Sequence, residues 1–131
     1  LTVNNIFGQK EKTDYSAVPN AIFTNPEIAS VGLKEEEAKN KNIDIKIGKF
    51  SFLGLGLAHI IGQTDGFIKI IADKESERVL GASLFGERAT ELVSCLGLAV
   101  KNKLSLSQIS NTIFAHPTIS ESIHEAALRA V

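Results

Sequence analysis

The chain has 131 residues, of which 44% are apolar and 22% are charged, and its formal net charge is −1. These values describe one folded globular domain and exclude a largely disordered chain. The small net charge argues against a nucleic-acid partner or an anionic membrane surface, and no apolar run reaches membrane-spanning length. The single cysteine, Cys95, excludes an internal disulfide and a cysteine-rich metal site, and it fits a reducing compartment. We therefore predict no metal site.

The first residues predict the end of one structural unit. Their apolar side chains follow a helical stripe, and Gly8 is a suitable end for that helix. A polar stretch then runs to residue 17. We expect residues 1–14 to be a helix end and a linker, and residues 15–131 to be the main domain.

Two short strands are predicted next, at 21–24 and 28–31, with a turn at Asn25-Pro26 between them. Residues 34–41 predict an exposed helix. Its acidic residues come first and its lysines last, which is the order that the helix dipole favours.

The central part of the chain predicts further strands. Isoleucines at 43, 45 and 47 alternate with polar residues, which is typical of a half-buried strand. Phenylalanines at 50 and 52 continue the alternation on the other parity, so we expect a bulge near Gly48. Residues 53–61 are apolar and rich in glycine, and we expect an apolar loop or a broken strand there.

The last half of the chain predicts a hairpin followed by helices. Strands at 67–72 and 79–85 flank a polar loop. Helical spacing of apolar residues predicts a helix at 88–102, a short helical turn at 106–109 and a final helix at 119–130. Together these elements predict an α+β fold, in which an antiparallel sheet carries helices packed on it.

One segment carries residues typical of acid/base chemistry. His116 precedes Pro117, which disfavours a helical conformation for the histidine. Glu121 falls in the first turn of the following helix and can fold back toward the imidazole. A carboxylate on one ring nitrogen fixes the tautomer and leaves the other nitrogen free to exchange a proton, which is a general-base arrangement.

A structural interpretation of the same residues is also open. Thr118 and Glu121 have the spacing of a capping box, in which the Glu reaches back to the backbone at the start of a helix. On spacing alone the capping role is the favoured one. The remaining candidates have structural interpretations: His59 as a structural or at most channel-lining residue, His124 on a solvated helix face, and Cys95 as a small buried core residue.

Several motifs in order resemble one known family. Residues 116–121 resemble the His-Pro-Thr-x-x-Glu signature of the pyridine nucleotide–disulfide oxidoreductases, and residues 15–32 and 64–82 resemble the start and the central hairpin of their dimerisation (interface) domain. The resemblance covers the chain from about residue 15 onward. It implies that residues 1–14 are the end of a preceding nucleotide-binding region and its linker. Within the family the resemblance is strongest to dihydrolipoamide dehydrogenases, with a glutathione- or mercuric-reductase type as the alternative.

The resemblance implies a homodimer in which each active site uses both subunits. FAD and a redox-active disulfide would come from one subunit, and the pair His116–Glu121 from the other. His116 would take a proton from a dithiol substrate, and electrons would pass through the disulfide and FAD to NAD. The resemblance also implies that the backbone of His116 and Pro117 lies near the partner's flavin.

The resemblance has further implications and limits. The family implies a cytoplasmic or mitochondrial-matrix enzyme, with 2-oxo acid dehydrogenase complex components as partners. This chain lacks a Cys-x-x-x-x-Cys pair and a Gly-x-Gly-x-x-Gly fingerprint, so we expect it to bind no FAD or NAD alone. The hypothesis of a different class is a purely structural dimerisation module. Lys34 also departs from the Thr that often caps the first helix in the family, so we expect that cap to be lost.

Overall fold

A computed structural model describes residues 1–130. The helices and strands, in chain order, are α1 (Thr2–Ile6), β1 (Asn20–Ile22), β2 (Ile28–Gly32), α2 (Glu35–Asn40), β3 (Ile45–Ser51), the 3-10 turn η1 (Phe52–Gly54), α3 (Gly56–Ile60), β4 (Phe67–Asp73), β5 (Val79–Phe85), α4 (Ala89–Lys101), α5 (Leu106–Ser110) and α6 (Glu121–Leu128).

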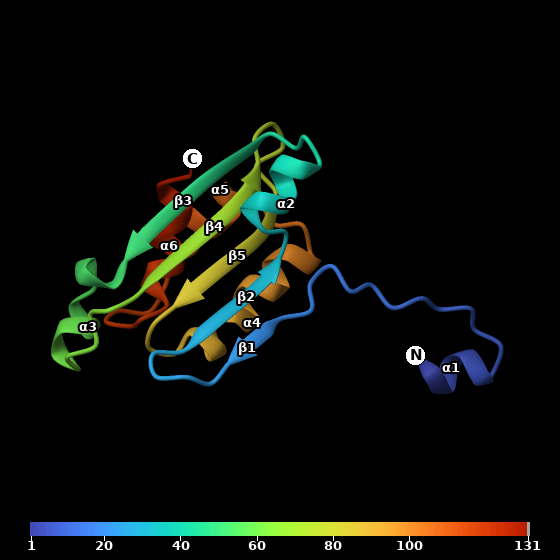
Figure 1. The fold of residues 1–131 in the computed structure, drawn as a ribbon, viewed down its shortest axis with the longest axis horizontal. Helices are drawn as coiled ribbons and strands as arrows, with labels where there is room; N and C mark the ends of the chain where they lie inside the picture. Colours follow the sequence, from blue (N-terminus) through green and yellow to red (C-terminus); the bar gives the residue numbers. More distant parts are fainter. Residues whose placement is uncertain (131) are drawn as a thin grey trace.

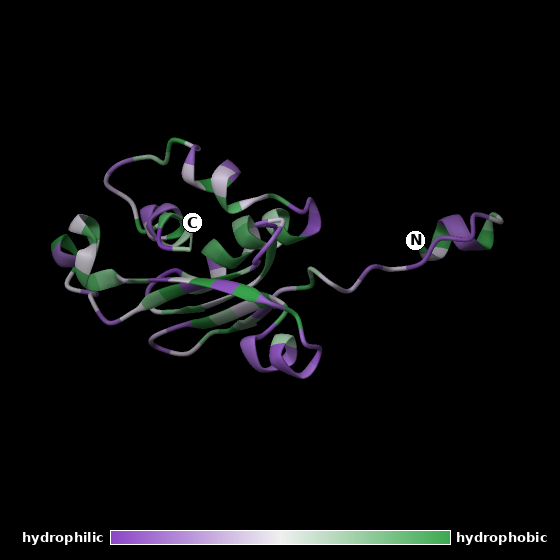
Figure 2. Ribbon diagram, turned by 90° about the horizontal axis from the view of Figure 1, so that it is seen from above, coloured by the Kyte–Doolittle hydropathy of each residue, from purple (hydrophilic) through white to green (hydrophobic). Residues whose placement is uncertain are grey.

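The five strands form one sheet in the order β1-β2-β5-β4-β3, and every neighbouring pair is antiparallel. Helices α4, α5 and α6 cover one face of the sheet, whereas the short, polar α2 lies on the other face (Figures 1 and 2). This arrangement confirms the α+β prediction of an antiparallel sheet with helices packed on it.

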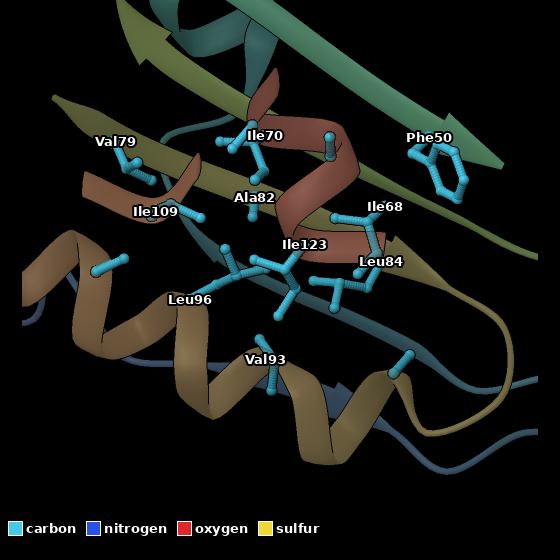
Figure 3. Close-up of a cluster of buried hydrophobic side chains, with 14 of the residues drawn as sticks. Phe50, Ile68, Ile70, Val79, Ala82, Leu84, Val93, Leu96, Ile109 and Ile123 are labelled. Carbon is cyan, nitrogen blue, oxygen red and sulfur yellow. The ribbon is translucent and has the colours of Figure 1, made fainter. Parts of the chain in front are cut away.

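The core lies between the sheet and α4, α5 and α6. Figure 3 shows side chains of β4 and β5, such as Ile68 and Leu84, directed toward Val93 and Leu96 of α4 and Ile123 of α6. Each of these five side chains is at most 1% exposed. Burying a side chain of this size contributes roughly 1.5–3 kcal/mol, so the core holds α6 firmly against the sheet.

Strand β3 corrects the predicted bulge. It pairs with β4 in one uninterrupted register from Ile45 to Ser51, and the irregularity of the sheet lies between Ile71 and Ala72 of β4 instead. The buried side of β3 carries Gly48 and Phe50, whereas Ile47 lies on the other side and is 39% exposed. The prediction was wrong because it assigned the buried face to the isoleucines, although the strand faces α6 with a glycine.

The segment after β3 also differs from the prediction of an apolar loop or broken strand. It forms the turn η1 and the short helix α3, with Phe52, Leu55 and Ala58 buried. His59 closes this unit, because its Nε2 lies 2.8 Å from the carbonyl oxygen of Leu53. This contact fits the structural interpretation of His59, and the channel-lining alternative stays a prediction.

The N-terminal helix α1 lies apart from the sheet, at the end of an extended segment (Figure 1). None of its residues is buried. The division into residues 1–14 and 15–131 stays a prediction. Within residues 1–130 no helix has the length and apolar character needed to cross a membrane.

Candidate functional site

His116 and Glu121 form a close pair at the start of α6. Nδ1 of His116 lies 2.8 Å from Oε1 of Glu121, and the His116 side chain is 76% exposed. The peptide bond between His116 and Pro117 is cis. Within residues 1–130 Nε2 of His116 has no hydrogen-bond partner. The ring is therefore oriented by one nitrogen while the other faces solvent.

The second oxygen of Glu121 holds the backbone. Oε2 accepts a hydrogen bond from the Thr118 backbone N–H at 2.9 Å. This backbone donor, followed by the His116 ring, lowers the pKa of Glu121 from its usual value, because both interactions favour the charged carboxylate. One carboxylate thus makes both contacts that the sequence left open, since it reaches back to the helix start and also touches the imidazole.

Only half of the expected capping box is present. The Thr118 hydroxyl does not cap α6; it donates to the Ala115 carbonyl oxygen at 2.7 Å, and it also lies 2.7 Å from the Ser120 hydroxyl. Ser120, the N-cap residue of α6, makes no side-chain capping bond. The Thr118 hydroxyl instead closes the tight loop that contains His116 and Pro117.

His124 corrects a prediction. We expected it on a solvated face, but its side chain is only 30% exposed, and its Nε2 lies 3.0 Å from the Ser110 carbonyl oxygen at the end of α5. Its ring is tilted against Phe114, with 5.8 Å between the ring centroids. The prediction was wrong because α5 packs beside α6, an arrangement that the spacing within α6 does not reveal.

Cys95 corrects another prediction. We expected it in the core, but it is exposed. The buried face of α4 is formed by Ala89, Val93, Leu96 and Ala99, and Cys95 lies one residue to the side of it. Partial burial raises the pKa of the Cys95 thiol, which disfavours the nucleophilic thiolate. Residues 1–130 also contain no group of three His, Cys, Asp or Glu side chains that could hold a metal ion.

Carboxylates cap two other helices of the domain. Glu27 was not singled out from the sequence, yet its Oε2 accepts from the backbone N–H of Thr90 at 2.8 Å and from the Thr90 hydroxyl at 2.7 Å. This carboxylate caps α4 from the β1–β2 connection, and no local signal predicts a bond over that separation. At α2 the expected loss of the side-chain cap at Lys34 is confirmed, and Glu37 accepts from the Lys34 backbone N–H instead.

Comparisons with known proteins identify the family of the chain. The family described as "Pyridine nucleotide-disulphide oxidoreductase, dimerisation domain" matches residues 18–127. Dihydrolipoyl dehydrogenase of Chlamydia trachomatis is 47% identical over 131 residues, which are 100% of this chain and 28% of that protein. Dihydrolipoyl dehydrogenase of Bacillus subtilis is 44% identical over 89% of this chain and 25% of that protein.

Solved structures share the fold. LpdA of Mycobacterium tuberculosis superposes with a TM-score of 0.89 at 24% identity, over 98% of this chain and 28% of that chain. The HOCl-induced flavoprotein disulfide reductase RclA of Escherichia coli superposes with a TM-score of 0.85 at 27% identity, over 96% of this chain and 30% of that chain. The chain thus spans less than a third of the length of these relatives.

Proposed function

This chain belongs to the dimerisation-domain family of the pyridine nucleotide–disulfide oxidoreductases, and we propose that it supplies the acid/base pair His116–Glu121 to the active site of a partner subunit. The enzyme would be of the dihydrolipoyl dehydrogenase type, like the relatives from Chlamydia and Bacillus. A homodimer follows from the family, because its defining domain is a dimerisation domain.

The proposed chemistry uses the free nitrogen of His116. Nε2 accepts the proton of a substrate thiol, and the resulting thiolate is the species that attacks a disulfide. The charge that develops on the imidazole is balanced by Glu121, whose carboxylate already contacts Nδ1. In the reverse direction the imidazolium returns the proton to a leaving thiolate. The pair therefore performs general acid and general base catalysis in turn.

The exposed loop around His116 fits a contact with a flavin carried elsewhere in the enzyme. Residues 115–117 are exposed. The electron pair would leave the dithiol that the substrate forms at the redox cysteine pair, and FAD, bound by the rest of the enzyme, would carry it to NAD. The contribution of this chain would be the backbone of His116 and Pro117 against that cofactor. Flavin absorbance that co-purifies with the isolated chain would contradict this division of labour.

The observation that carries the proposal is the 2.8 Å contact between His116 and Glu121, combined with the exposure of the His116 ring. The test is His116→Ala in the full-length enzyme, assayed with dihydrolipoamide and NAD. We expect turnover to fall by roughly 10²-fold or more, because general-base catalysis contributes on this order. His59→Ala is the matched control, since His59 also makes one hydrogen bond through a single ring nitrogen, to the Leu53 carbonyl oxygen, but lies in the η1–α3 unit.

The structural alternative gives the opposite result. If His116 and Glu121 only organise the start of α6, His116→Ala weakens the dimer in sedimentation while each remaining dimer keeps its turnover. Substrate choice is tested separately. A glutathione- or mercuric-reductase type would reduce glutathione disulfide or mercuric ion faster than lipoamide. Binding of 2-oxo acid dehydrogenase components would be measured by co-sedimentation with the full-length enzyme.

A further inference from the structure

The segment that leads to His116 has few backbone restraints. Helix α5 ends at Ser110, and the last backbone hydrogen bond of that turn joins the Thr112 N–H to the Ile109 carbonyl oxygen. From there to Thr118 the described chain shows no further backbone–backbone hydrogen bond. The side chain of Ile113 is 96% exposed. Side-chain contacts must therefore determine where His116 lies.

His124 supplies contacts to both parts of this segment. Its Nε2 lies 3.0 Å from the Ser110 carbonyl oxygen, where the segment begins, and its ring packs against Phe114, two residues before His116. Phe114 is half-buried and packs against the core. His124 also follows Glu121 by one turn of α6. One helix therefore carries both the carboxylate that orients His116 and the ring that holds the approach to His116.

We propose that His124 is a positioning residue for His116. It acts through Phe114 and Ser110. It keeps residues 110–115, the approach segment, packed against α6, so that the His116 ring reaches Glu121. The proposal deepens the proposed function of His116 and rests on it for its catalytic meaning. The structural claim stands independently, because the position of the His116 ring can be measured without turnover.

The geometry predicts the tautomers of both rings. Nε2 of His124 can contact a carbonyl oxygen only as a donor, so its neutral ring carries the proton there. His116 contacts a carboxylate through Nδ1, so its neutral ring carries the proton on Nδ1. If the approach segment is released from α6, His116 loses its contact with Glu121 and has no further reason to carry its proton on Nδ1. The Nδ1-protonated fraction of His116 therefore reports whether the segment is docked.

The experiment measures ring ¹⁵N shifts of His116 in this chain at alkaline pH, for the wild type and three variants. His124→Ala removes the hydrogen bond and the ring contact, and we expect the ratio of the Nδ1-H to the Nε2-H tautomer to fall about 5-fold, the scale of one hydrogen bond. His124→Phe keeps a ring against Phe114 and should give an intermediate ratio. His59→Ala is the matched control, because it breaks the same type of bond, Nε2 to a backbone carbonyl, at 2.8 Å in the η1–α3 unit.

An unchanged tautomer ratio in folded His124→Ala would overturn the proposal. If that variant does not fold, His124→Phe decides, and a wild-type ratio in it would show that the hydrogen bond to Ser110 has no positioning role. In the full-length enzyme we expect His124→Ala to lower kcat with dihydrolipoamide about 5-fold while KM stays constant. Should His116→Ala leave turnover intact, the proposed function fails, but the tautomer result still tests the positioning claim.

Discussion

Gly48 of β3 and Ala126 of α6 are in direct backbone contact. A Cβ atom on Gly48 would fall 1.9 Å from the Ala126 carbonyl oxygen and 2.8 Å from the Ala130 Cβ. Only a residue without a side chain permits this approach. The contact sets the distance between the edge strand β3 and α6, the helix that begins with Glu121. The position of the candidate site on the sheet therefore depends on glycine at residue 48.

We expect Gly48→Ala to destabilise the chain by about 1–3 kcal/mol, the usual cost of overpacking, because α6 has to move away from β3. Chemical denaturation measures the effect. Gly56→Ala is the matched control, since a Cβ at Gly56 meets no atom within 4 Å. The control should be neutral or stabilising by up to about 1 kcal/mol, because alanine favours the helical conformation at this position. Equal effects of the two changes would contradict the close contact.

The Thr118 hydroxyl offers a second test. Thr118→Val keeps the shape of the side chain but removes the donor to the Ala115 carbonyl oxygen, which lies 2.7 Å away. We expect a loss of about 1 kcal/mol in the free energy of unfolding and faster exchange of the Thr118 amide, whose N–H is bonded to Glu121 within the same loop. Thr118→Ser retains the hydroxyl and should restore slow exchange. A valine variant that exchanges like the wild type would show that the loop is closed by other contacts.

The free energy of unfolding at acid pH depends on the protonation of Glu121. Its pKa is lowered in the folded chain, first by the Thr118 N–H and then by His116. A carboxyl with a depressed folded pKa stabilises above its unfolded pKa, and this stabilisation is lost as the pH falls through the folded value. The contribution is thus present at neutral pH, declines below the ordinary glutamate pKa of 4.5, and is lost once the pH falls below the lowered pKa of Glu121 in the folded chain.

We therefore expect Glu121→Gln to lower stability by about 1 kcal/mol at neutral pH and to have little effect in strong acid. Denaturant unfolding across the acid range gives the two values. Glu36→Gln serves as the control, because the Glu36 side chain forms no hydrogen bond or ion pair within residues 1–130. Parallel profiles for Glu121→Gln and the wild type would mean that the Glu121 contacts contribute no free energy.

An apolar row crosses the face of the sheet that carries α2, opposite α4 and α6. The pairing register aligns Phe67 of β4 with Phe85 of β5, Phe85 with Ile28 of β2, and Ile28 with Ile22 of β1. Ile22 and Ile28 are 44% and 42% exposed. Apolar surface of this kind marks contacts with other protein surfaces.

We expect Ile28→Asp to test what covers this row. If the sheet forms part of the dimer contact, the full-length variant dissociates to monomers in sedimentation at concentrations where the wild type is dimeric. A variant that stays dimeric but shows a lower unfolding temperature would assign the row to another domain of its own subunit. Leu98→Asp, on the far side of the molecule in α4 and 64% exposed, is the comparison for a solvent-facing apolar residue.

Local patterns predicted most of the sheet. The hairpin of β4 and β5 was predicted within one residue at each end, because alternation and a polar turn are properties of neighbouring residues. The parity of β3 was not predictable, because Gly48 carries no apolar signal although it is buried. The exposure of Cys95 depends on how α4 is rotated about its axis relative to the sheet. The apolar residues of α4 form a broad stripe that does not define this rotation to within one residue.

The candidate site divides in the same way. The contact between His116 and Glu121 follows from Pro117 and a spacing of five residues, so the sequence predicted it. The role of His124 depends on the packing of α5 against α6, and the bond of Glu27 to Thr90 joins residues 63 positions apart. Such contacts arise only after the helices are placed by the core.

The exposure of the His116 ring has a consequence for how activity would scale with assembly. An imidazole that is 76% exposed in its own chain has no shelter from bulk water there, so under the proposed function the partner subunit would have to enclose it. Turnover would then vanish on dilution together with the dimer. A mixture of one subunit type lacking the imidazole and another lacking the redox cysteines would regain activity through hybrid pairs, each with a single working centre.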